Sequence, residues 1–329
     1  MRKLLLVLIG IGLIVGCGDD DDGIEGIEIP PRLLSEVVIE DDAEIQEFLN
    51  THFYNYEDFE SPVDPNFDFK IVIDKIEGEN ADKTPLIDQV ESIEVKVSSF
   101  EFGLDDGEED IVHKLYYLNA RDGVGEDPSV ADSVFVRYNG RFLDGIPFDG
   151  SDSGIWFDLA RIQAPLQGAR GFTEGVSLFN AGQIPIDQPN DGTFTAEGFG
   201  VGAIFMPSGL AYFNIGQGTI DPYTPIMFDV QVLTLNFADH DNDGIPSIQE
   251  DLNQNGYLYD DNTDQSDEEE VQGNPLVANL LDIDDDGDGI LTRTEISDAD
   301  GNIIFPYPDS NNDGTPDYLD PDVQRDPNE

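Results

Sequence analysis

Hydrophobic and polar positions alternate most regularly in the middle of the chain, between residues 132 and 236. The run SVFVRY at 133–138 places every second side chain on a common face, which is the period of a half-buried strand. That face carries Val134, Val136 and Tyr138. Residues 225–233 repeat the alternation, with one face formed by Ile226, Phe228, Val230 and Val232. The pattern therefore predicts strands at both ends of this stretch.

Helical spacing is found between these two strands and again near the N-terminus. Phe172, Val176 and Phe179 are spaced i, i+4 and i+7, which predicts a short helix that buries this stripe. Another helix is predicted at 41–52, where Asp41 or Asp42 caps the first turn. Its apolar stripe consists of Ala43, Ile45, Phe48 and Leu49.

Three further strand patterns precede the central stretch, at residues 67–73, 93–102 and 111–118. They predict either an extension packed on the central sheet or a separate small β subdomain. The sequence leaves both arrangements open.

The charge of the chain is unusual. Its 329 residues include 71 Asp and Glu against 15 Lys and Arg, so the net charge is −56 at pH 7. Such a chain repels nucleic acid and anionic lipid, and nucleic acid is therefore not an expected partner. The acidity indicates either a strongly solvated surface or cation binding, and the placement of the acidic residues decides between them.

The acidic residues are patterned at the C-terminal end. From residue 239 onward there are 27 Asp and Glu, and the only basic residues are Arg293 and Arg325. Three stretches match positions 1, 3, 5 and 12 of a calcium loop, with Gly at position 6. They are Asp239, Asp241, Asp243 and Glu250; Asp284, Asp286, Asp288 and Glu295; and Asp309, Asn311, Asp313 and Asp320. A weaker fourth start is formed by Asp251, Asn253 and Asn255.

These loops predict that the tail binds calcium. Ligands that are all oxygen suit a hard cation rather than zinc. The alternative is a disordered acidic tail, but unpatterned acidity does not repeat D-x-D-x-D-G at loop spacing. The loops lack long flanking amphipathic helices and resemble the type 3 repeats of thrombospondins as much as EF-hands. Residues 263–272 are expected to form a flexible linker.

The N-terminus has the pattern of a targeting segment. Arg2 and Lys3 precede an apolar run at 4–15, which is too short to span a bilayer stably. Ile14-Val-Gly-Cys17 resembles the lipobox of bacterial lipoproteins, which implies lipidation of Cys17, the single cysteine of the chain. The implied location is the cell envelope, with a lipid anchor in the outer membrane and the chain on its periplasmic or surface side. The alternative is plain secretion or an uncleaved anchor, and the acidic run at 18–22 is either a tether or an export signal.

Six short motifs follow one another through the central stretch. They are Val136-Arg-Tyr-Asn-Gly140, Asp144-Gly145, Phe148-Asp149, Gly171-Phe-Thr-Glu-Gly175, Pro207-Ser-Gly-Leu-Ala-Tyr212 and Phe228-Asp-Val230. In this order they resemble an FKBP-type peptidyl-prolyl cis-trans isomerase domain. The resemblance implies an α+β fold, in which a twisted antiparallel sheet wraps around one short helix and an apolar pocket lies between them.

The resemblance also implies which side chains form the pocket. They are Tyr138, Phe148, Asp149, Trp156, Phe172, Tyr212, Ile220 and Phe228, and Phe157 is an alternative to Trp156. The Tyr212 hydroxyl corresponds to the donor to the substrate carbonyl. Taken singly, each of these residues fits a plain core position better, but taken as a set in family order they favour a pocket.

Several positions depart from the family pattern. Phe172 stands where the family usually has Trp, Gly168-Ala169 replace a branched aliphatic pair, and Phe213 follows Tyr212 where the family usually has Gly. An insertion at 183–202 lengthens the hairpin before Ala203. A pocket that is larger or differently shaped is expected.

Two functions are compatible with these patterns. The first is a peptidyl-prolyl isomerase that acts on proline-containing polypeptides and requires no cofactor for catalysis, with calcium bound only in its tail. The second is a non-catalytic surface lipoprotein that uses the same fold as a binding or structural module. His52, His113 and His240 are expected to be surface or structural residues.

The predicted organisation has five parts. Residues 1–17 form the signal peptide with its lipobox, and 18–40 form a linker. Residues 41–118 hold the first helix and the β extension. The isomerase domain occupies 119–237, and the acidic calcium-binding tail occupies 238–329.

Overall fold

The computed structural model describes residues 30–60, 63–64, 66–188, 195–270 and 276–326. The apolar run at 4–15, Cys17 and the acidic run at 18–22 lie outside the described residues. The chain divides into two units, Met1–Pro31 and Arg32–Glu329, and all described elements belong to the second. No helix among the described residues is both long enough and apolar enough to cross a bilayer.

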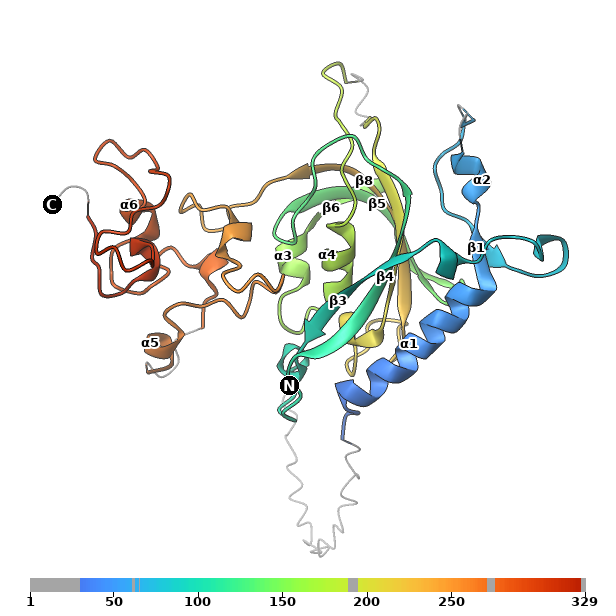
Figure 1. Ribbon diagram of the computed structural model, residues 1–329, viewed down its shortest axis with the longest axis horizontal. Helices are drawn as coiled ribbons and strands as arrows, with labels where there is room; N and C mark the ends of the chain where they lie inside the picture. Colours follow the sequence, from blue (N-terminus) through green and yellow to red (C-terminus); the bar gives the residue numbers. More distant parts are fainter. Residues whose placement is uncertain (1–29, 61–62, 65, 189–194, 271–275, 327–329) are drawn as a thin grey trace, which may run out of the picture. The chain divides into compact units, whose positions relative to one another are not determined.

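A six-stranded antiparallel sheet forms the centre of the second unit (Figure 1). Its spatial order is β3-β4-β7-β8-β5-β6. The strands are β3 (Glu91–Val97), β4 (Ile111–Arg121), β5 (Ser133–Phe142), β6 (Pro147–Asp158), β7 (Gly200–Met206) and β8 (Ile226–Asn236). Strands β5 and β6 form a hairpin through the turn predicted at Asp144-Gly145, where Gly145 has a φ of 86°.

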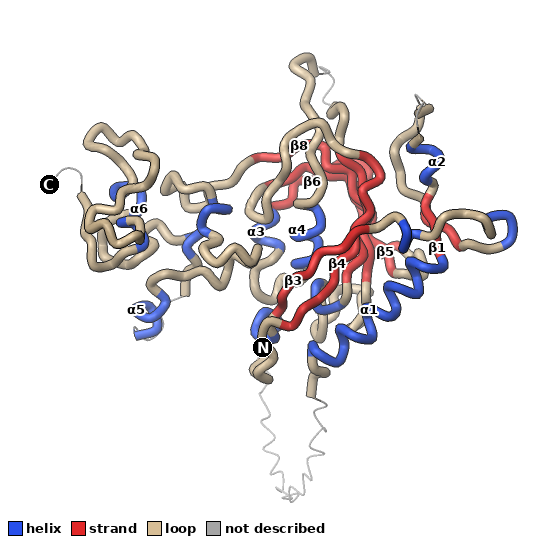
Figure 2. Tube along the Cα trace, in the orientation of Figure 1, coloured by secondary structure: helices blue, strands red, loops and turns tan. Residues whose placement is uncertain are grey.

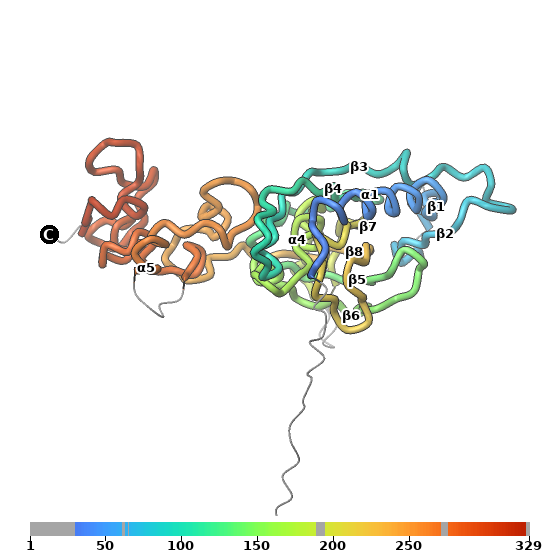
Figure 3. The backbone as a smooth tube through the Cα atoms, turned by 90° about the horizontal axis from the view of Figure 1, so that it is seen from below, coloured from blue at the N-terminus to red at the C-terminus, as the bar shows by residue number. Residues whose placement is uncertain are grey.

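Each face of this sheet is covered by one helix. On one face, α4 (Arg170–Val176) buries Phe172 and Val176 against alternate residues of β5, β7 and β8. On the other, the C-terminal part of α1 (Leu34–Thr51) packs Ile45, Phe48 and Leu49 on the intervening residues. Because side chains of a strand alternate between faces, β7 contributes Ile204 to one core and Phe205 to the other. Figure 3 shows α1 and α4 from below.

The α+β class and the short helix against an antiparallel sheet are confirmed. Val134, Val136, Ile226, Phe228, Val230 and Val232 all belong to the core under α4, as the alternation predicts. Strands β3 and β4 join the same sheet, so the β extension is not a separate subdomain. The sheet therefore begins well before residue 119.

Helix α1 starts earlier than its sequence pattern predicts. It begins at Leu34 rather than near residue 41, because the buried stripe continues back through Val37 and Leu34. Asp41 is therefore not a cap. It lies inside the helix, 3% exposed, where its carboxylate accepts hydrogen bonds from the backbone N–H and Oγ of Ser208 at 2.7 and 2.6 Å.

The strand predicted at 67–73 is largely absent. Only Ile73 belongs to a strand, β2 (Ile73–Lys75), which pairs with β1 (His52–Tyr54). Phe69 has a φ of 57°, which breaks an extended run. The apolar side chains instead form an aromatic cluster beside α2 (Tyr56–Phe59), and the Arg121 guanidinium stacks on the Phe69 ring at 4.1 Å.

The remaining elements are short. The pattern at 93–102 is strand only as far as Val97, and Ser99–Phe102 form a 3₁₀ turn closed by a capping box. Helix α3 (Leu159–Ile162) follows β6. After β8 the chain is mostly loop (Figure 2), interrupted by α5 (Gln265–Glu270) and α6 (Thr292–Glu295). The flexible linker predicted at 263–272 is thus helical at α5, where Glu268 is buried.

One buried arginine joins the helix, the sheet and the start of the tail. Arg170, at the first position of α4, is 6% exposed. Its guanidinium group donates to the carbonyl oxygens of Lys96 and Asn255 and to the carboxylates of Glu101 and Glu174. It also lies 4.8 Å from the ring centroid of Tyr257. Burial raises the pKa of Glu174 to about 7, although the charge of Arg170 opposes this rise.

We expect Arg170→Met to destabilise the protein by about 3–5 kcal/mol, because it leaves two buried carboxylates without a counter-charge. The control is Arg32→Met, which removes one partner of an exposed ion pair with Glu40 and should cost at most about 1 kcal/mol. Urea unfolding of both variants at saturating calcium measures the difference. Equal losses of stability would contradict the role assigned to Arg170.

Candidate functional site

A cavity of about 360 Å³ lies between α4 and the sheet. Its lining includes Tyr138 of β5, Asp149, Trp156 and Phe157 of β6, Phe172 of α4, Tyr212, and Phe228 of β8. The remaining lining residues are Asp158, Arg161, Ile162, Gln167, Gly168 and Ala169. The cavity is therefore aromatic on the sheet side and more polar along α3 and the segment that follows it.

The aromatic side of the cavity is held by edge-to-face contacts. The Phe172 ring meets Phe157 at 5.2 Å and Phe228 at 5.1 Å between centroids, and Tyr138 meets Phe157 at 5.2 Å. This geometry places the positive edge of one ring against the negative face of another. Each ring is thus fixed by two or more others, and the cavity is preformed.

Two tyrosine hydroxyls and one carboxylate supply the main polar groups near these rings. The Tyr138 hydroxyl donates to Asp149 Oδ2 at 2.7 Å. Burial, and then the hydrogen bond to Asp149, raises the pKa of Tyr138 far above its usual value. Burial and the charge of Asp149 also raise the pKa of Tyr212. Both hydroxyls are therefore neutral donors at physiological pH, and no hydrogen bond of the Tyr212 hydroxyl is found among the described residues.

Six of the eight side chains expected from the sequence meet at this cavity. Phe148 and Ile220 are the other two. The Phe148 ring packs edge-on against Phe228 at 5.5 Å and is not part of the lining. Ile220 is 6% exposed and belongs to the core below α4.

The two candidate aromatics of β6 differ in their surroundings. The Phe157 ring lies against Tyr138 and Phe172 inside the cavity. Trp156 is 46% exposed, and its ring packs on Phe135 of the neighbouring strand at 5.4 Å. Both residues line the cavity, but Phe157 is the one that is packed with its other rings.

The polar rim formed by α3 was not expected from the sequence. Asp158 caps α3 by accepting from the Arg161 backbone N–H at 3.2 Å, and His240 Nε2 lies 3.1 Å from the same carboxylate oxygen. Burial opposes ionisation of Asp158, but the contacts with His240 and Arg161 outweigh it and lower its pKa. Asp-Leu-Ala-Arg after a strand is a readable helix-start signal. His240, expected to be merely structural, thus links the first acidic loop to the cavity rim.

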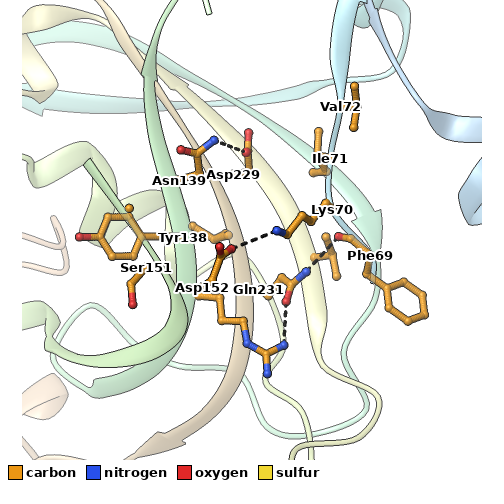
Figure 4. A pocket seen from close by; sticks show the side chains of 14 residues that line it. Phe69, Lys70, Ile71, Val72, Tyr138, Asn139, Ser151, Asp152, Asp229 and Gln231 are labelled. Carbon is orange, nitrogen blue, oxygen red and sulfur yellow. Dashed lines mark hydrogen bonds and ion pairs between the residues drawn. The ribbon is translucent and has the colours of Figure 1, made fainter. Parts of the chain in front are cut away.

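A second cavity of about 370 Å³ is lined by β5, β6, β8 and the segment from Phe69 to Val72 (Figure 4). Its polar groups are already engaged with one another. Lys70 pairs with Asp152 at 3.1 Å, and Arg137 donates to Gln231 at 3.2 Å. Figure 4 shows the Tyr138 ring turned away from Lys70. This cavity contains none of the other side chains expected at the pocket.

The acidic tail folds into four loops with the same backbone pattern, at residues 239–250, 251–262, 284–295 and 309–320. In each, the Gly at position 6 donates its N–H to the carboxylate at position 1, at 3.0 to 3.2 Å. These glycines have φ values between 78° and 105°, a conformation that side chains with a Cβ rarely adopt. The weak fourth start at Asp251 therefore forms the same turn as the three stronger matches.

Each Asp at positions 1, 3 and 5 of loops 239–250 and 284–295 uses one oxygen to hold the turn. Its other oxygen is buried without a hydrogen-bond partner among the described residues; these oxygens are Asp239 Oδ1, Asp241 Oδ2, Asp243 Oδ2, Asp284 Oδ1, Asp286 Oδ2 and Asp288 Oδ2. Buried oxygens without a donor are costly unless a cation satisfies them. This donor set fits a hard divalent cation such as calcium.

The described part of the chain contains three groups of converging carboxylates. Within each group, one oxygen per residue lies within 4.8 Å of the others. The groups are Asp241, Asp243, Glu250 and Asp285; Asp264, Glu268 and Asp282; and Asp284, Asp286 and Asp288. Asp239 and Glu295 lie outside these groups. The sequence pattern did not indicate Asp264, Glu268, Asp282 or Asp285.

Loop 309–320 differs from loops 239–250 and 284–295. Its carboxylates do not converge to the same degree among the described residues. The Asn311 amide instead donates to Asp313 at 3.1 Å and to Asp320 at 2.8 Å.

Parts of the chain are similar to known proteins. It is 30% identical over 134 residues to the probable FKBP-type peptidyl-prolyl cis-trans isomerase FkpA of Neisseria meningitidis serogroup B, covering 40% of this chain and 41% of that protein. It is 33% identical over 133 residues to the FKBP-type isomerase FkpA of Aeromonas hydrophila, covering 39% and 41%. The crystal structure of FkpA from Escherichia coli matches at 28% identity with a TM-score of 0.28, over 37% of this chain and 48% of that one.

The tail matches a different family. The model described as BamM C-terminal matches residues 240–308. The chain spans less than half of the length of the curated relatives it matches. Similarity to FKBP-type isomerases therefore extends over about two fifths of the chain.

Proposed function

We propose that this protein is a peptidyl-prolyl cis-trans isomerase whose catalytic site is the cavity under α4. The observation that carries the proposal is the preformed aromatic cavity with the Tyr212 hydroxyl at its lining. The similarity to FKBP-type isomerases supports it. The substrates are proline-containing polypeptides.

The reaction requires little of the protein beyond a shaped, dry cavity. Rotation about an X-Pro bond crosses a barrier of about 18–20 kcal/mol because the amide loses resonance as it twists. The twisted amide is less polar than the planar one, so an apolar cavity favours it relative to the ground state. Tyr212 would donate to a carbonyl of the bound peptide, while Tyr138 and Asp149, held to each other by a hydrogen bond, form part of the lining.

The second candidate is a non-catalytic binding module built on the same cavity. The observation that favours it is the composition of the lining, where Gly168 and Ala169 carry little or no side chain and the Tyr212 ring fills the space beside Gly168. A lining of this different shape could bind a peptide without pressing on the X-Pro bond. Measurement of rate and of binding separates the two functions.

We also infer that the tail binds calcium. The support comes from the carboxylates that converge without hydrogen-bond donors and from the loop turns that position them. The ions order a segment that has a small apolar core of its own, made of Ile245, Ile296 and Tyr318 with Tyr307 and Leu319 beside them.

The chain is further proposed to be a lipoprotein of the cell envelope, anchored through Cys17 to the outer membrane. The support is the lipobox-like sequence before Cys17. An extracytoplasmic location also suits calcium sites of the extracellular class, whose dissociation constants are roughly 10⁻⁴ to 10⁻³ M.

Tyr212→Phe should lower the rate of X-Pro isomerisation by roughly 2- to 10-fold, the value of one neutral hydrogen bond lost in the transition state. Combining Tyr212→Ala with Asp149→Ala should lower it further without unfolding the sheet. A proline-peptide assay measures the rates, and circular dichroism checks the fold. Tyr56→Phe is the matched control, since Tyr56 lies in α2 and does not line the cavity.

If the wild-type protein does not raise the rate above that of the uncatalysed peptide, the isomerase proposal is rejected. Binding of the same peptide under those conditions would then support the binding module. A loss of rate in Tyr56→Phe equal to that in Tyr212→Phe would show that the effect is not local to the cavity.

Chelation of calcium should disorder residues 239–322 and leave the sheet folded. Without the ions, the clustered carboxylates repel one another, and the small apolar core of the tail does not offset the chain entropy. Limited proteolysis and circular dichroism, with calcium and with chelator, follow the two regions separately. Equal protease resistance of the tail in both conditions would contradict the calcium proposal.

Replacing Cys17 by serine should release the protein from membranes or leave the precursor uncleaved. Within Ile14-Val-Gly-Cys17, only the Cys17 side chain has a nucleophilic atom, its sulfur, that can carry the lipid. Membrane fractionation and the mass of the mature chain report both effects. Unchanged processing together with unchanged fractionation would exclude the lipid anchor.

A further inference from the structure

Asp285 occupies the second position of loop 284–295, which holds no ligand in the calcium-loop pattern. Its side chain is 1% exposed, and both carboxylate oxygens are buried without a hydrogen-bond partner among the described residues. Only its backbone is engaged, with the N–H donating to Thr292 Oγ1 at 3.1 Å. Nothing within its own loop explains a buried carboxylate at this position.

The carboxylate of Asp285 points at a different loop. One of its oxygens lies within 4.8 Å of one carboxylate oxygen each of Asp241, Asp243 and Glu250, which are positions 3, 5 and 12 of loop 239–250. Asp243 and Glu250 are each 2% exposed. The neighbouring residues Asp284 and Asp286 converge instead on Asp288 within loop 284–295. Adjacent side chains of one loop thus face two separate centres.

A purely structural role does not account for this arrangement. An aspartate that stabilises a fold by hydrogen bonding needs donors, and Asp285 has none among the described residues. Four carboxylates around one centre repel one another strongly in a buried site unless a cation lies among them. The charge of Arg293 acts on Asp243, but no ion pair with any of these four carboxylates is found among the described residues.

We propose that Asp285 is a ligand of the calcium ion bound by loop 239–250, so that this site is completed by a residue of loop 284–295. The proposal rests on calcium binding by the tail, proposed above. The ion at loop 239–250 would then have carboxylate ligands from two loops, and the second centre would keep Asp284, Asp286 and Asp288.

The consequence is that the two loops dock through the ion. Loop 239–250 supplies three of the four converging carboxylates, and loop 284–295 alone leaves a buried charge at Asp285. Binding at full affinity would therefore require the tertiary arrangement of both loops, and removal of the ion would weaken their contact.

The test compares Asp285→Asn with Asp284→Asn, its neighbour in the same loop, in the purified full chain. Asparagine keeps the size of the side chain and removes only its charge. Each is also combined with Asp241→Asn, which removes a ligand of loop 239–250. Calcium binding isotherms, measured by equilibrium dialysis after chelator treatment, give the number of ions and their affinities.

Asp285→Asn should weaken one site by at least roughly 10- to 100-fold, the range found even for residues that only support metal ligands. If Asp285 and Asp241 bind the same ion, the Asp241→Asn/Asp285→Asn double variant loses no more ions than Asp241→Asn alone. The Asp241→Asn/Asp284→Asn double variant should lose one more. Circular dichroism at saturating calcium checks that every variant remains folded.

Two other outcomes overturn the inference. Asp285 does not share that ion if Asp285→Asn binds calcium like the wild type. The same holds if the Asp241→Asn/Asp285→Asn double variant loses one more calcium ion than Asp241→Asn alone. In both cases the tail still binds calcium. If the wild-type chain takes up no calcium at all, the proposed calcium function fails, and the shared site fails with it.

Discussion

The buried guanidinium of Arg170 is the interaction on which the rest of the structure depends. It is contacted by the strand β3 through Lys96, by the turn at Glu101, by α4 itself through Glu174 and by the tail through Asn255 and Tyr257. Each of these segments would carry an unsatisfied buried group if the arginine moved. Because α4 also carries Phe172, the same contact that attaches the tail sets the position of the cavity floor. Fold, site and tail thus share one electrostatic anchor.

Periodicity predicted the elements that pack around the core under α4. Strand β5 follows its alternation closely, with Val134 and Val136 buried between partly exposed neighbours. Strand β8 and helix α4 are buried on nearly all sides, so their apolar spacing identified only the side chains that meet in this core. The run at 67–73 shows the limit of this reasoning. Its alternation is real, but no strand pairs with most of it, and its half-buried rings pack against Phe59 and Arg121 instead. An alternating pattern predicts which side chains are buried, but not which part of the chain packs against them.

The candidate sites show the same limit at the level of single residues. Trp156 and Phe157 alternate along β6, and the register that pairs Phe157 with the core residue Val134 decides which ring meets Phe172. In the tail, loop spacing indicated Asp241, Asp243, Asp284, Asp286 and Asp288, which belong to converging groups of carboxylates, and also Asp239, which does not. Asp285 lies between two of them and was not predicted, since its role follows from which loop packs beside it. The spacing of residues within a loop predicts the turn, but which loops pack together depends on the fold of the whole tail.

The gathering of Asp285 with Asp241 and Asp243 has a consequence for the topology of the chain. The sequence contains a single cysteine, so no disulfide can form within it. The proposed ion would join Asp243 and Asp285, which lie 42 residues apart. It would stabilise this contact through its free energy of binding to the ordered loops, and not by restricting the unfolded chain as a covalent bridge does. Unlike a covalent bridge, it would open and close with the concentration of a diffusible ion.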